Sequence, residues 1–416
     1  MFKTYAEQKK AWGNNRGVGL RFSLAAGAMS LMLALPVAAG PREQAKRIHD
    51  RLTGVPPTVD VLDAMTAKVG AGAYGPIEAA LIAMDPVNGN PENAKYFYNV
   101  TLKNFAAPWT NEAQSVFEPL NDYTATVIGM VRDDVPFNQL FSVDYVYGAP
   151  NLNSVSSISP DSNAHYEDLE AQAVDLSDPA VFRQVKQVTA VGLPDSSAAA
   201  GVLTSRAAAR AFFIDGTNRA MFRFTMLNHL CNDLEQVKDT TRAADRIRQD
   251  VSRSPGGDSR IFLNACVGCH SGMDPMAQAF AYYEYEYPEG NEDAGRLVYT
   301  AGQVQPKYLI NADNFKYGYV TQDDGWENYW RQGPNANLGW DESGLPSGSG
   351  NGARTMGEEL ANSNAYGRCQ VTKVFRTVCL GEPDDGQMNA LLGVYRDNYF
   401  SLKQVFAKAA TQCMGN

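Results

Sequence analysis

One short segment constrains this chain more than any other: Ala265-Cys266-Val267-Gly268-Cys269-His270. Two cysteines three positions apart, followed at once by histidine, form the C-x-x-C-H pattern of covalent c-type haem attachment. Both thiols can add to vinyl groups of one porphyrin, and the adjacent imidazole then ligates the iron. With 6 Cys and 4 His in 416 residues, an accidental match is expected in roughly one such chain in 1,200. The pattern therefore predicts one haem c per chain, held by Cys266 and Cys269, with His270 as the proximal iron ligand.

Three other interpretations of this pattern explain less of it. A thioredoxin-like redox pair would need a βαβ context, and no such run of strands flanks the segment. A structural zinc site needs four ligands, usually from two paired knuckles, and the chain has no second C-x-x-C pair. An ordinary disulfide between Cys266 and Cys269 would leave the adjacent His270 unexplained.

The first 39 residues have the features of a secretory signal peptide. Residues 22–35 are an almost unbroken apolar run, and Val37-Ala38-Ala39 offers small residues to signal peptidase before Gly40. Basic residues precede the apolar run: Lys3, Lys9, Lys10, Arg16 and Arg21. The alternative is an uncleaved anchor, because residues 22–39 are just long enough to cross a bilayer. Cleavage is the favoured interpretation, and it predicts a periplasmic, extracellular or cell-surface protein with no membrane span.

The charge of the mature chain disfavours several kinds of partner. Residues 1–39 hold five Lys or Arg and one Glu, so their removal leaves 31 basic and 45 acidic side chains and a net charge of −14. Such a charge argues against nucleic acid and anionic lipid surfaces. It would suit a basic or neutral partner, although it also serves solubility alone.

Four cysteines remain outside the haem motif, and export would place them in an oxidising compartment where disulfides persist. They are Cys231, Cys369, Cys379 and Cys413. Three connectivities are possible. We expect Cys379 to pair with Cys413, because both lie on expected C-terminal helices, and this leaves Cys231 with Cys369.

The hydrophobic pattern predicts a mainly α, multi-helix protein with a cytochrome c-like haem-binding part and long irregular loops. We divide it into an N-terminal helical domain (40–145), a central helical domain with a loop (146–258), and a haem domain with C-terminal helices (259–416). Helices are expected over residues 41–52, 58–69, 76–84, 91–105, 122–131, 179–188, 201–213, 218–230, 275–285, 356–366, 367–380, 385–396 and 401–413. Irregular or flexible segments are expected over 146–176, 239–257 and 335–352, with short β-like pieces at 297–300 and 308–310.

The second axial ligand of the iron is the main open question. Met273 is rejected, because three extended residues after His270 reach only about 10–11 Å and would have to pass around the porphyrin edge. Met273-Asp274-Pro275 is instead expected to turn the chain and begin the next helix. Met356, which follows a long polar loop, is the predicted distal ligand, and a core methionine is the alternative. His229 is the next candidate for this position. The weaker candidates are Met276 and His165.

Several motifs occur together in a recognisable order. They are residues 48–58, Val135-Pro136-Phe137 with Asp144-Tyr145, Gly201-Val202-Leu203-Thr204 with Asn218-Arg219 and Leu230-Cys231, Cys266 through Met273-Asp274-Pro275 to Glu284, and residues 366–371 with Leu380-Gly381. This ordered set resembles the cytochrome c-like proteins of unknown function that are abundant in planctomycetes and myxobacteria. The resemblance covers nearly the whole mature chain. In one departure, Glu382 follows Gly381 where that family usually has a basic residue.

The resemblance implies export, covalent haem on Cys266 and Cys269, and His270 as proximal ligand. It also implies that Cys231 and Cys369 are family features, which suits a bridge between them. It supplies no established reaction. We therefore expect one-electron transfer with a periplasmic or surface redox partner. A peroxidase-type haem enzyme and an accessory factor in extracellular polymer breakdown stay open, because one haem on roughly 377 residues is more protein than a simple carrier needs.

Overall fold

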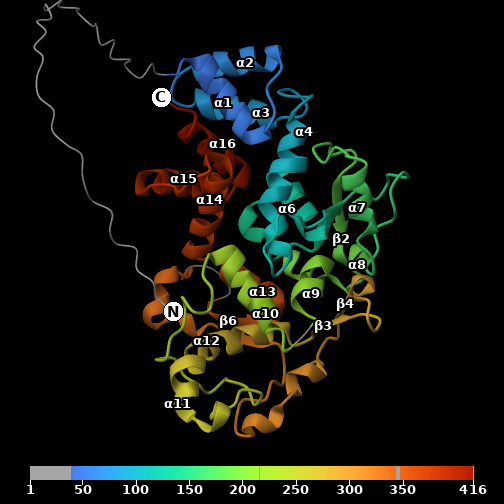
Figure 1. Ribbon diagram of the computed structural model, residues 1–416, viewed down its shortest axis with the longest axis vertical. Coiled ribbons are helices and arrows are strands. Elements are labelled where there is room, and N and C mark those ends of the chain that lie inside the picture. The colour runs from blue at the N-terminus through green and yellow to red at the C-terminus, as the bar shows by residue number, and fades with distance from the viewer. Residues whose placement is uncertain (1–38, 215, 343–346, 416) are drawn as a thin grey trace, which may run out of the picture. The chain divides into compact units, whose positions relative to one another are not determined.

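The computed structural model describes residues 39–214, 216–342 and 347–415 (Figure 1). The predicted signal peptide, apart from its last residue, lies outside the described residues. The described chain is mainly helical, with 53% helix and 7% strand, as predicted. Among the helices of these residues, none is long and apolar enough to cross a membrane.

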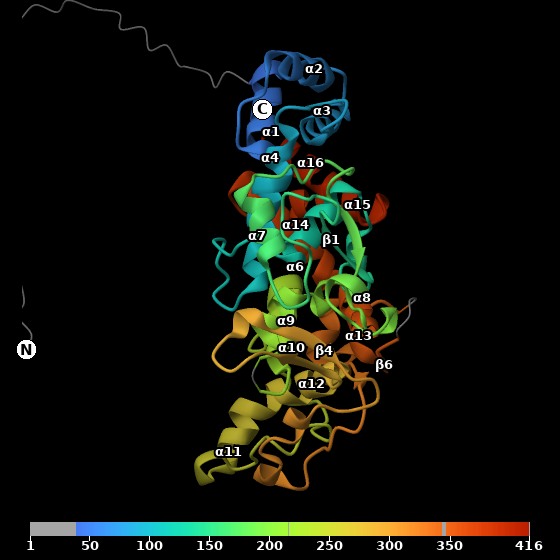
Figure 2. The same cartoon turned by 90° about the vertical axis from the view of Figure 1, so that its right-hand side faces the viewer.

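The two ends of the described chain pack together. Helices α1 (Pro41–Thr53), α2 (Val59–Val69) and α3 (Gly75–Met84) contact one another, and α1 and α3 also contact the last helix, α16 (Leu402–Gln412) (Figures 1 and 2). Helix α16 also packs on α14 (Asn364–Cys379) and α15 (Asp385–Asp397). The segments 40–145 and 259–416, which the sequence analysis treated as separate domains, therefore share helix packing, and residues 39–416 form one unit.

Local capping explains several of these helix starts. The Thr58 side chain accepts a hydrogen bond from the Val61 amide at the start of α2. Ser401 caps α16 in the same way. The cap of α15 is Asp384, which forms a capping box with Gln387. Asp385, the first residue of the expected helix, is the first residue of α15.

Helix α6 (Asp122–Arg132) lies in the middle of the core, and every one of its residues is buried. It packs on β1 (Tyr145–Gly148), which pairs antiparallel with β2 (Arg183–Lys186). This approach is close: a Cβ built on Gly129 would lie 2.1 Å from the Tyr147 ring. Helix α6 therefore needs glycine at this position.

Two predictions for the central segment are wrong. The expected loop over 146–176 contains most of β1 and the helix α7 (Ala164–Ala171). The expected helix over 179–188 is instead β2 followed by α8 (Gln187–Ala190). Strand pairing between β1 and β2 satisfies backbone groups of both segments, a long-range contact that local sequence does not reveal.

The remaining elements complete the core and the haem-motif region. The helices expected over 91–105, 201–213 and 218–230 are present in shorter pieces: α4 (Ala94–Tyr96), η1 (Phe97–Leu102), α5 (Lys103–Ala106), η5 (Gly201–Thr204), α9 (Arg206–Phe212), α10 (Arg219–Thr225) and η6 (Met226–Leu230). Beyond them lie α11 (Ser259–Ile261), η8 (Phe262–Cys266), α12 (Val267–Ala277), η9 (Gln278–Phe280), β3 (Tyr283–Glu286), β4 (Arg296–Tyr299), β5 (Gly325–Glu327), β6 (Ser349–Asn351) and α13 (Gly352–Ala361).

The structure corrects the expectations around the motif. Helix α12 begins at Val267 and continues through Pro275, so Met273-Asp274-Pro275 does not turn the chain. Pro275 has no N–H to donate to the Ser271 carbonyl one turn earlier, and α12 ends two residues after it. The expected helix over 275–285 therefore ends early, and β3 follows, paired with β4. The β-like piece at 297–300 matches β4, whereas 308–310 belongs mostly to a 3-10 turn (Pro306–Leu309).

The charged segment 239–257, expected to be flexible, is held against the rest of the protein. Arg248 is 1% exposed, and Asp239 is also buried. Paired charges allow burial here: Asp239 contacts Arg242, and Arg248 lies near Asp250. The expected loop over 335–352 contains the end of a 3-10 turn (Gly333–Leu338) and β6. Residues 343–346 of that loop lie outside the described residues.

We predict that Gly272→Ala destabilises the protein by about 1–3 kcal/mol, because a Cβ at position 272 would overlap the buried Trp330 ring. The built Cβ lies 2.1 Å from Trp330 Nε1. Gly393→Ala on α15 is the matched control, since its Cβ meets nothing closer than 4.0 Å. Alanine there should stabilise the helix by about 0.5–1 kcal/mol. Urea denaturation followed by far-UV circular dichroism measures the free energy of unfolding of both variants. Equal changes in the two would contradict the expected overlap with Trp330.

Candidate haem-attachment site

Helix α12 and the turn before it place the motif cysteines. Cys266 ends η8, Val267 begins α12, and Cys269 and His270 lie in the first turn of α12. Both thiols are free and partly exposed, while the other four cysteines form two disulfides. Burial raises the pKa of the Cys269 thiol, and nearby Glu235 adds to the shift. The motif cysteines are therefore unbridged and accessible, as covalent attachment requires.

The His270 imidazole forms a hydrogen bond with the carboxylate of Asp274. Its Nδ1 lies 3.1 Å from Oδ1 of Asp274, one helical turn further along α12. The His270 side chain is 21% exposed, and Asp274 is fully buried. An ionised carboxylate can only accept, so Nδ1 carries a proton, and in the neutral ring Nε2 keeps its lone pair. This arrangement of a ring nitrogen held by a carboxylate is the one that orients metal-binding histidines.

Asp274 belongs to a buried network of charges. Arg219, on α10, donates to both of its oxygens, from Nε at 2.7 Å and from Nη2 at 2.9 Å. The Arg248 amide is 3.3 Å from Oδ2 of Asp274. Arg219 also donates to both oxygens of Asp250, at 2.5 and 2.9 Å. Burial alone would raise the pKa of Asp274, but the Arg219 charge and the His270 hydrogen bond hold that pKa well below its usual range.

Aliphatic side chains are exposed beside the motif. Leu263 is 58% exposed and Ile261 is 45% exposed. Leu263, Cys266 and His270 recur at helical spacing and so share one side of the η8–α12 segment. Phe262 and Val267 form a small buried cluster with Ile247 and Val251, and Cys266 packs against this cluster. Two free thiols, an imidazole with an available Nε2 and exposed apolar surface together fit a covalently bound porphyrin.

The structure does not bring the predicted distal ligand to this site. Met356 is fully buried in the principal core on α13. Helix α13 packs on η9, at the opposite end of α12 from His270. The first residue of η9 follows His270 by eight positions, or about 12 Å along a helix axis. Ligation by Met356 would therefore require α13 to move.

The alternative candidates have other roles in this structure. His229 is buried, with Nε2 2.5 Å from the Tyr123 hydroxyl and Nδ1 3.3 Å from Gln370 Nε2. Burial holds the pKa of His229 well below its usual value, and the Lys373 charge adds to this effect. His165 is also buried, with its ring nitrogens near the Ser156 carbonyl and the Ala149 amide. Both histidines are core residues whose nitrogens already have partners, and Met276 is fully buried in the principal core.

We predict that Lys373→Met stabilises the protein at pH 7 and flattens the dependence of its stability on pH. Burial, with a smaller contribution from Arg376, lowers the pKa of Lys373 to about 7. Between that value and the ordinary lysine value of 10.5, the unfolded chain binds a proton that the folded protein lacks. The free energy of unfolding therefore rises with pH across this window.

Denaturation measured between pH 6 and 10 would test this expectation. Lys408→Met, on α16, is the control and should leave the slope unchanged. If Lys373→Met kept the wild-type slope of unfolding free energy against pH, burial of Lys373 would not be the cause of that slope.

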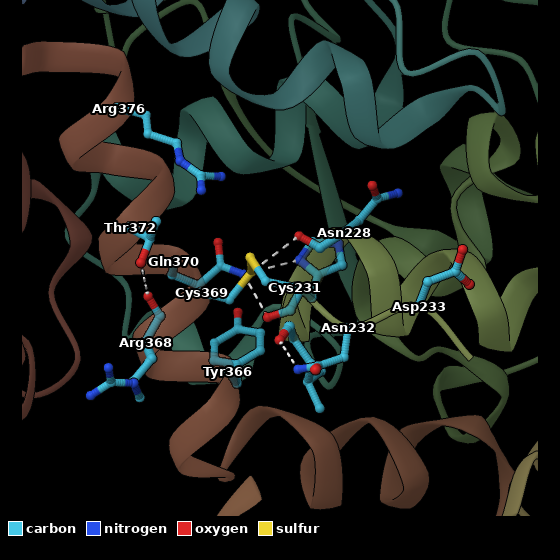
Figure 3. The surroundings of a disulfide bond; sticks show 12 residues. Asn228, Cys231, Asn232, Asp233, Tyr366, Arg368, Cys369, Gln370, Thr372 and Arg376 are labelled. Atoms are coloured by element: carbon cyan, nitrogen blue, oxygen red, sulfur yellow. Dashed lines mark hydrogen bonds between the residues drawn. A yellow bond between two sulfur atoms is a disulfide. The ribbon is translucent and has the colours of Figure 1, made fainter. Parts of the chain in front are cut away.

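Both disulfides expected from the sequence are present. Cys231 and Cys369 join the residue after η6 to α14, with their Cα atoms 5.4 Å apart. Cys379 joins the end of α14 to Cys413 at the end of α16, with a Cα separation of 5.6 Å. Figure 3 shows the first bridge among Asn228, Asn232 and Arg368. Residues close to this bridge approach the motif, because the Leu234 carbonyl oxygen is 3.6 Å from Cys269 Sγ.

The sequence analysis missed Asp274 and Arg219 as residues of the candidate site. The available signal was a carboxylate four positions after the motif histidine. It was overlooked because Pro275 was interpreted as the start of a new helix. Arg219 was part of the family resemblance, but its contact with Asp274 joins positions 55 residues apart. Only the tertiary fold brings these two residues together.

Comparisons with known proteins do not assign the chain to a family. No protein-family model matches it, and no curated protein or solved structure gives a significant match. The resemblance to the cytochrome c-like proteins therefore stays a prediction from motifs.

Proposed function

We propose that this chain is an exported monohaem c-type cytochrome that transfers single electrons to or from a periplasmic or cell-surface redox partner. The observation that carries the proposal is the pair of free, partly exposed thiols next to His270, whose Nδ1 is held by the buried Asp274. When bound, haem supplies an iron that changes between the ferric and ferrous states.

The residues of the chain would divide the work of holding that group. Cys266 and Cys269 would form the thioether bonds, and His270 would ligate the iron through Nε2. Asp274 orients the imidazole and makes it a stronger donor. Arg219 keeps Asp274 ionised. The two disulfides of the chain suit an oxidising compartment, which supports export.

The carboxylate partner of His270 also favours the second candidate, a peroxidase-type haem enzyme. A histidine that donates to a buried carboxylate pushes more electron density toward the iron, which stabilises the ferric state. Ligand binding distinguishes the two functions. Slow or absent binding of carbon monoxide and cyanide, with reversible reduction, supports electron transfer. Fast binding with peroxide turnover supports the enzyme.

Production alongside a cytochrome c maturation system tests haem attachment itself. We expect the mature chain to gain the mass of one haem and to keep its colour after acid–acetone extraction. Replacing both Cys266 and Cys269 by serine should abolish the covalent colour. The control is the Cys379→Ser/Cys413→Ser variant, which should keep it. A colourless wild-type protein with the mass of the bare chain would refute the proposal.

If the haem is bound as proposed, Asp274→Asn should raise its reduction potential, because asparagine can still accept the Nδ1 hydrogen bond but carries no negative charge. Asp250→Asn is the matched control: it removes the same charge and also contacts Arg219, but it does not contact His270. Spectroelectrochemical titration measures both variants. Equal shifts of the reduction potential in the two variants would show that the potential responds to the loss of a negative charge and not to the hydrogen bond between Asp274 and His270.

A further inference from the structure

A cavity of about 570 Å³ lies apart from the haem motif, among α3, η1, the end of α6 and α16. Part of its wall is apolar: Leu81, Ile82, Met84, Val87 and Tyr98. Its volume falls in the range of small-molecule sites. Neither the motif cysteines nor His270 line it.

Most of the charged groups in this wall already have partners. Lys68 pairs with Glu78 at 2.7 Å. Arg132 donates to both oxygens of Asp133, at 2.7 and 3.0 Å. The Asp85 carboxylate accepts from two backbone amides, those of Val87 and Asn88. The Tyr98 hydroxyl donates to the Met84 carbonyl oxygen at 2.9 Å. These groups need no ligand.

Lys403, on α16, is the exception. Its Nζ donates to the Arg132 carbonyl oxygen at 2.6 Å, and within the described part of the chain no carboxylate oxygen lies within 4.0 Å of it. An ammonium group carries three donors, so two are left without an acceptor among the described residues. Burial lowers the pKa of Lys403, while the more distant Asp134, Asp133 and Asp85 oppose this shift. Asp134 itself accepts from the Ser401 hydroxyl.

We propose that this cavity binds a small aliphatic carboxylate, with its chain against Leu81, Ile82 and Met84 and its carboxylate paired with Lys403. A half-buried cation with spare donors beside an apolar wall matches an anionic head and an aliphatic tail. A neutral alcohol offers no charge to pair with the lysine, and an amine would meet a like charge. The inference does not depend on haem binding, because the two sites share no residue.

Calorimetric titration of the full mature protein with hexanoate, octanoate and decanoate tests the proposal. Each buried methylene contributes about 0.8 kcal/mol, so we expect affinity to rise about fourfold for each methylene that enters the cavity. Octanol and octylamine should bind at least tenfold more weakly than octanoate. Equal binding of octanoate and octanol, or no binding of any carboxylate, would overturn the proposal.

Lys403→Met should lower octanoate affinity at least tenfold, while Lys408→Met, on the same helix, should leave it unchanged. Lys403→Arg should restore part of the affinity, because it returns the positive charge. Unchanged octanoate binding by Lys403→Met would overturn the proposal. If that variant does not fold, the comparison of octanoate with octanol on the wild-type protein decides the question.

Discussion

Arg219→Ala should lower the free energy of unfolding by about 3–5 kcal/mol, because it removes the partner of two buried carboxylates. Asp274 is fully buried and Asp250 nearly so, and Arg219 donates two hydrogen bonds to each of them. Without the guanidinium, both groups must become protonated or stay charged without their main cation. The measurement is chemical denaturation at neutral pH.

Arg223→Ala is the matched control for this prediction. Arg223 lies one turn further along α10 and pairs with Asp233 at 2.7 Å, but its side chain is 48% exposed. Exposed pairs are typically worth about 0–1 kcal/mol. If the two variants lost similar free energies of unfolding, the buried ion pairs of Arg219 would contribute no more to stability than the exposed pair of Arg223.

Removing the Cys231–Cys369 bridge by a double serine substitution should cost up to about 5 kcal/mol. The bridge joins residues 138 positions apart, and cross-linking a longer loop restricts the unfolded chain more. The Cys379–Cys413 bridge spans 34 positions, for which the same chain-entropy treatment gives about 4 kcal/mol. Cys369 is also buried, so its replacement disturbs packing near His229.

Denaturation of the two double-serine variants under non-reducing conditions compares the bridges directly. We expect the larger loss for the Cys231–Cys369 pair. A larger loss for the Cys379–Cys413 pair would mean that local packing outweighs the entropy of the unfolded chain. Because Leu234 lies close to Cys269, haem incorporation in the first variant is a useful second measurement.

Local patterns were sufficient for much of the helical structure. The N-terminal helices and the helices α14, α15 and α16 were predicted with small shifts at their ends. Each has an apolar stripe and recognisable end signals, so the information lies within a few residues of each position. The cysteine pairing was also expected before the structure.

Predictions failed where long-range contacts decide conformation. Strand β2 was expected to be helical, but it pairs with β1, nearly forty residues earlier in the chain. Met356 was expected at the iron because a polar loop precedes it, and it fills the core instead. Pro275 was interpreted as a helix start, although α12 continues through it. In the first two cases, contacts remote in sequence outweighed the local preference.

The sequence by itself determined that two thiols and an imidazole are adjacent, since that chemistry needs only neighbouring residues. Only the tertiary structure decided which carboxylate contacts the imidazole and where the half-buried Lys403 lies. Asp274, Arg219 and Asp250 meet because three separate segments pack together, and Lys403 faces an apolar wall built from the other end of the chain. Burial and pairing of charges depend on the packing of distant segments, and no local pattern records it.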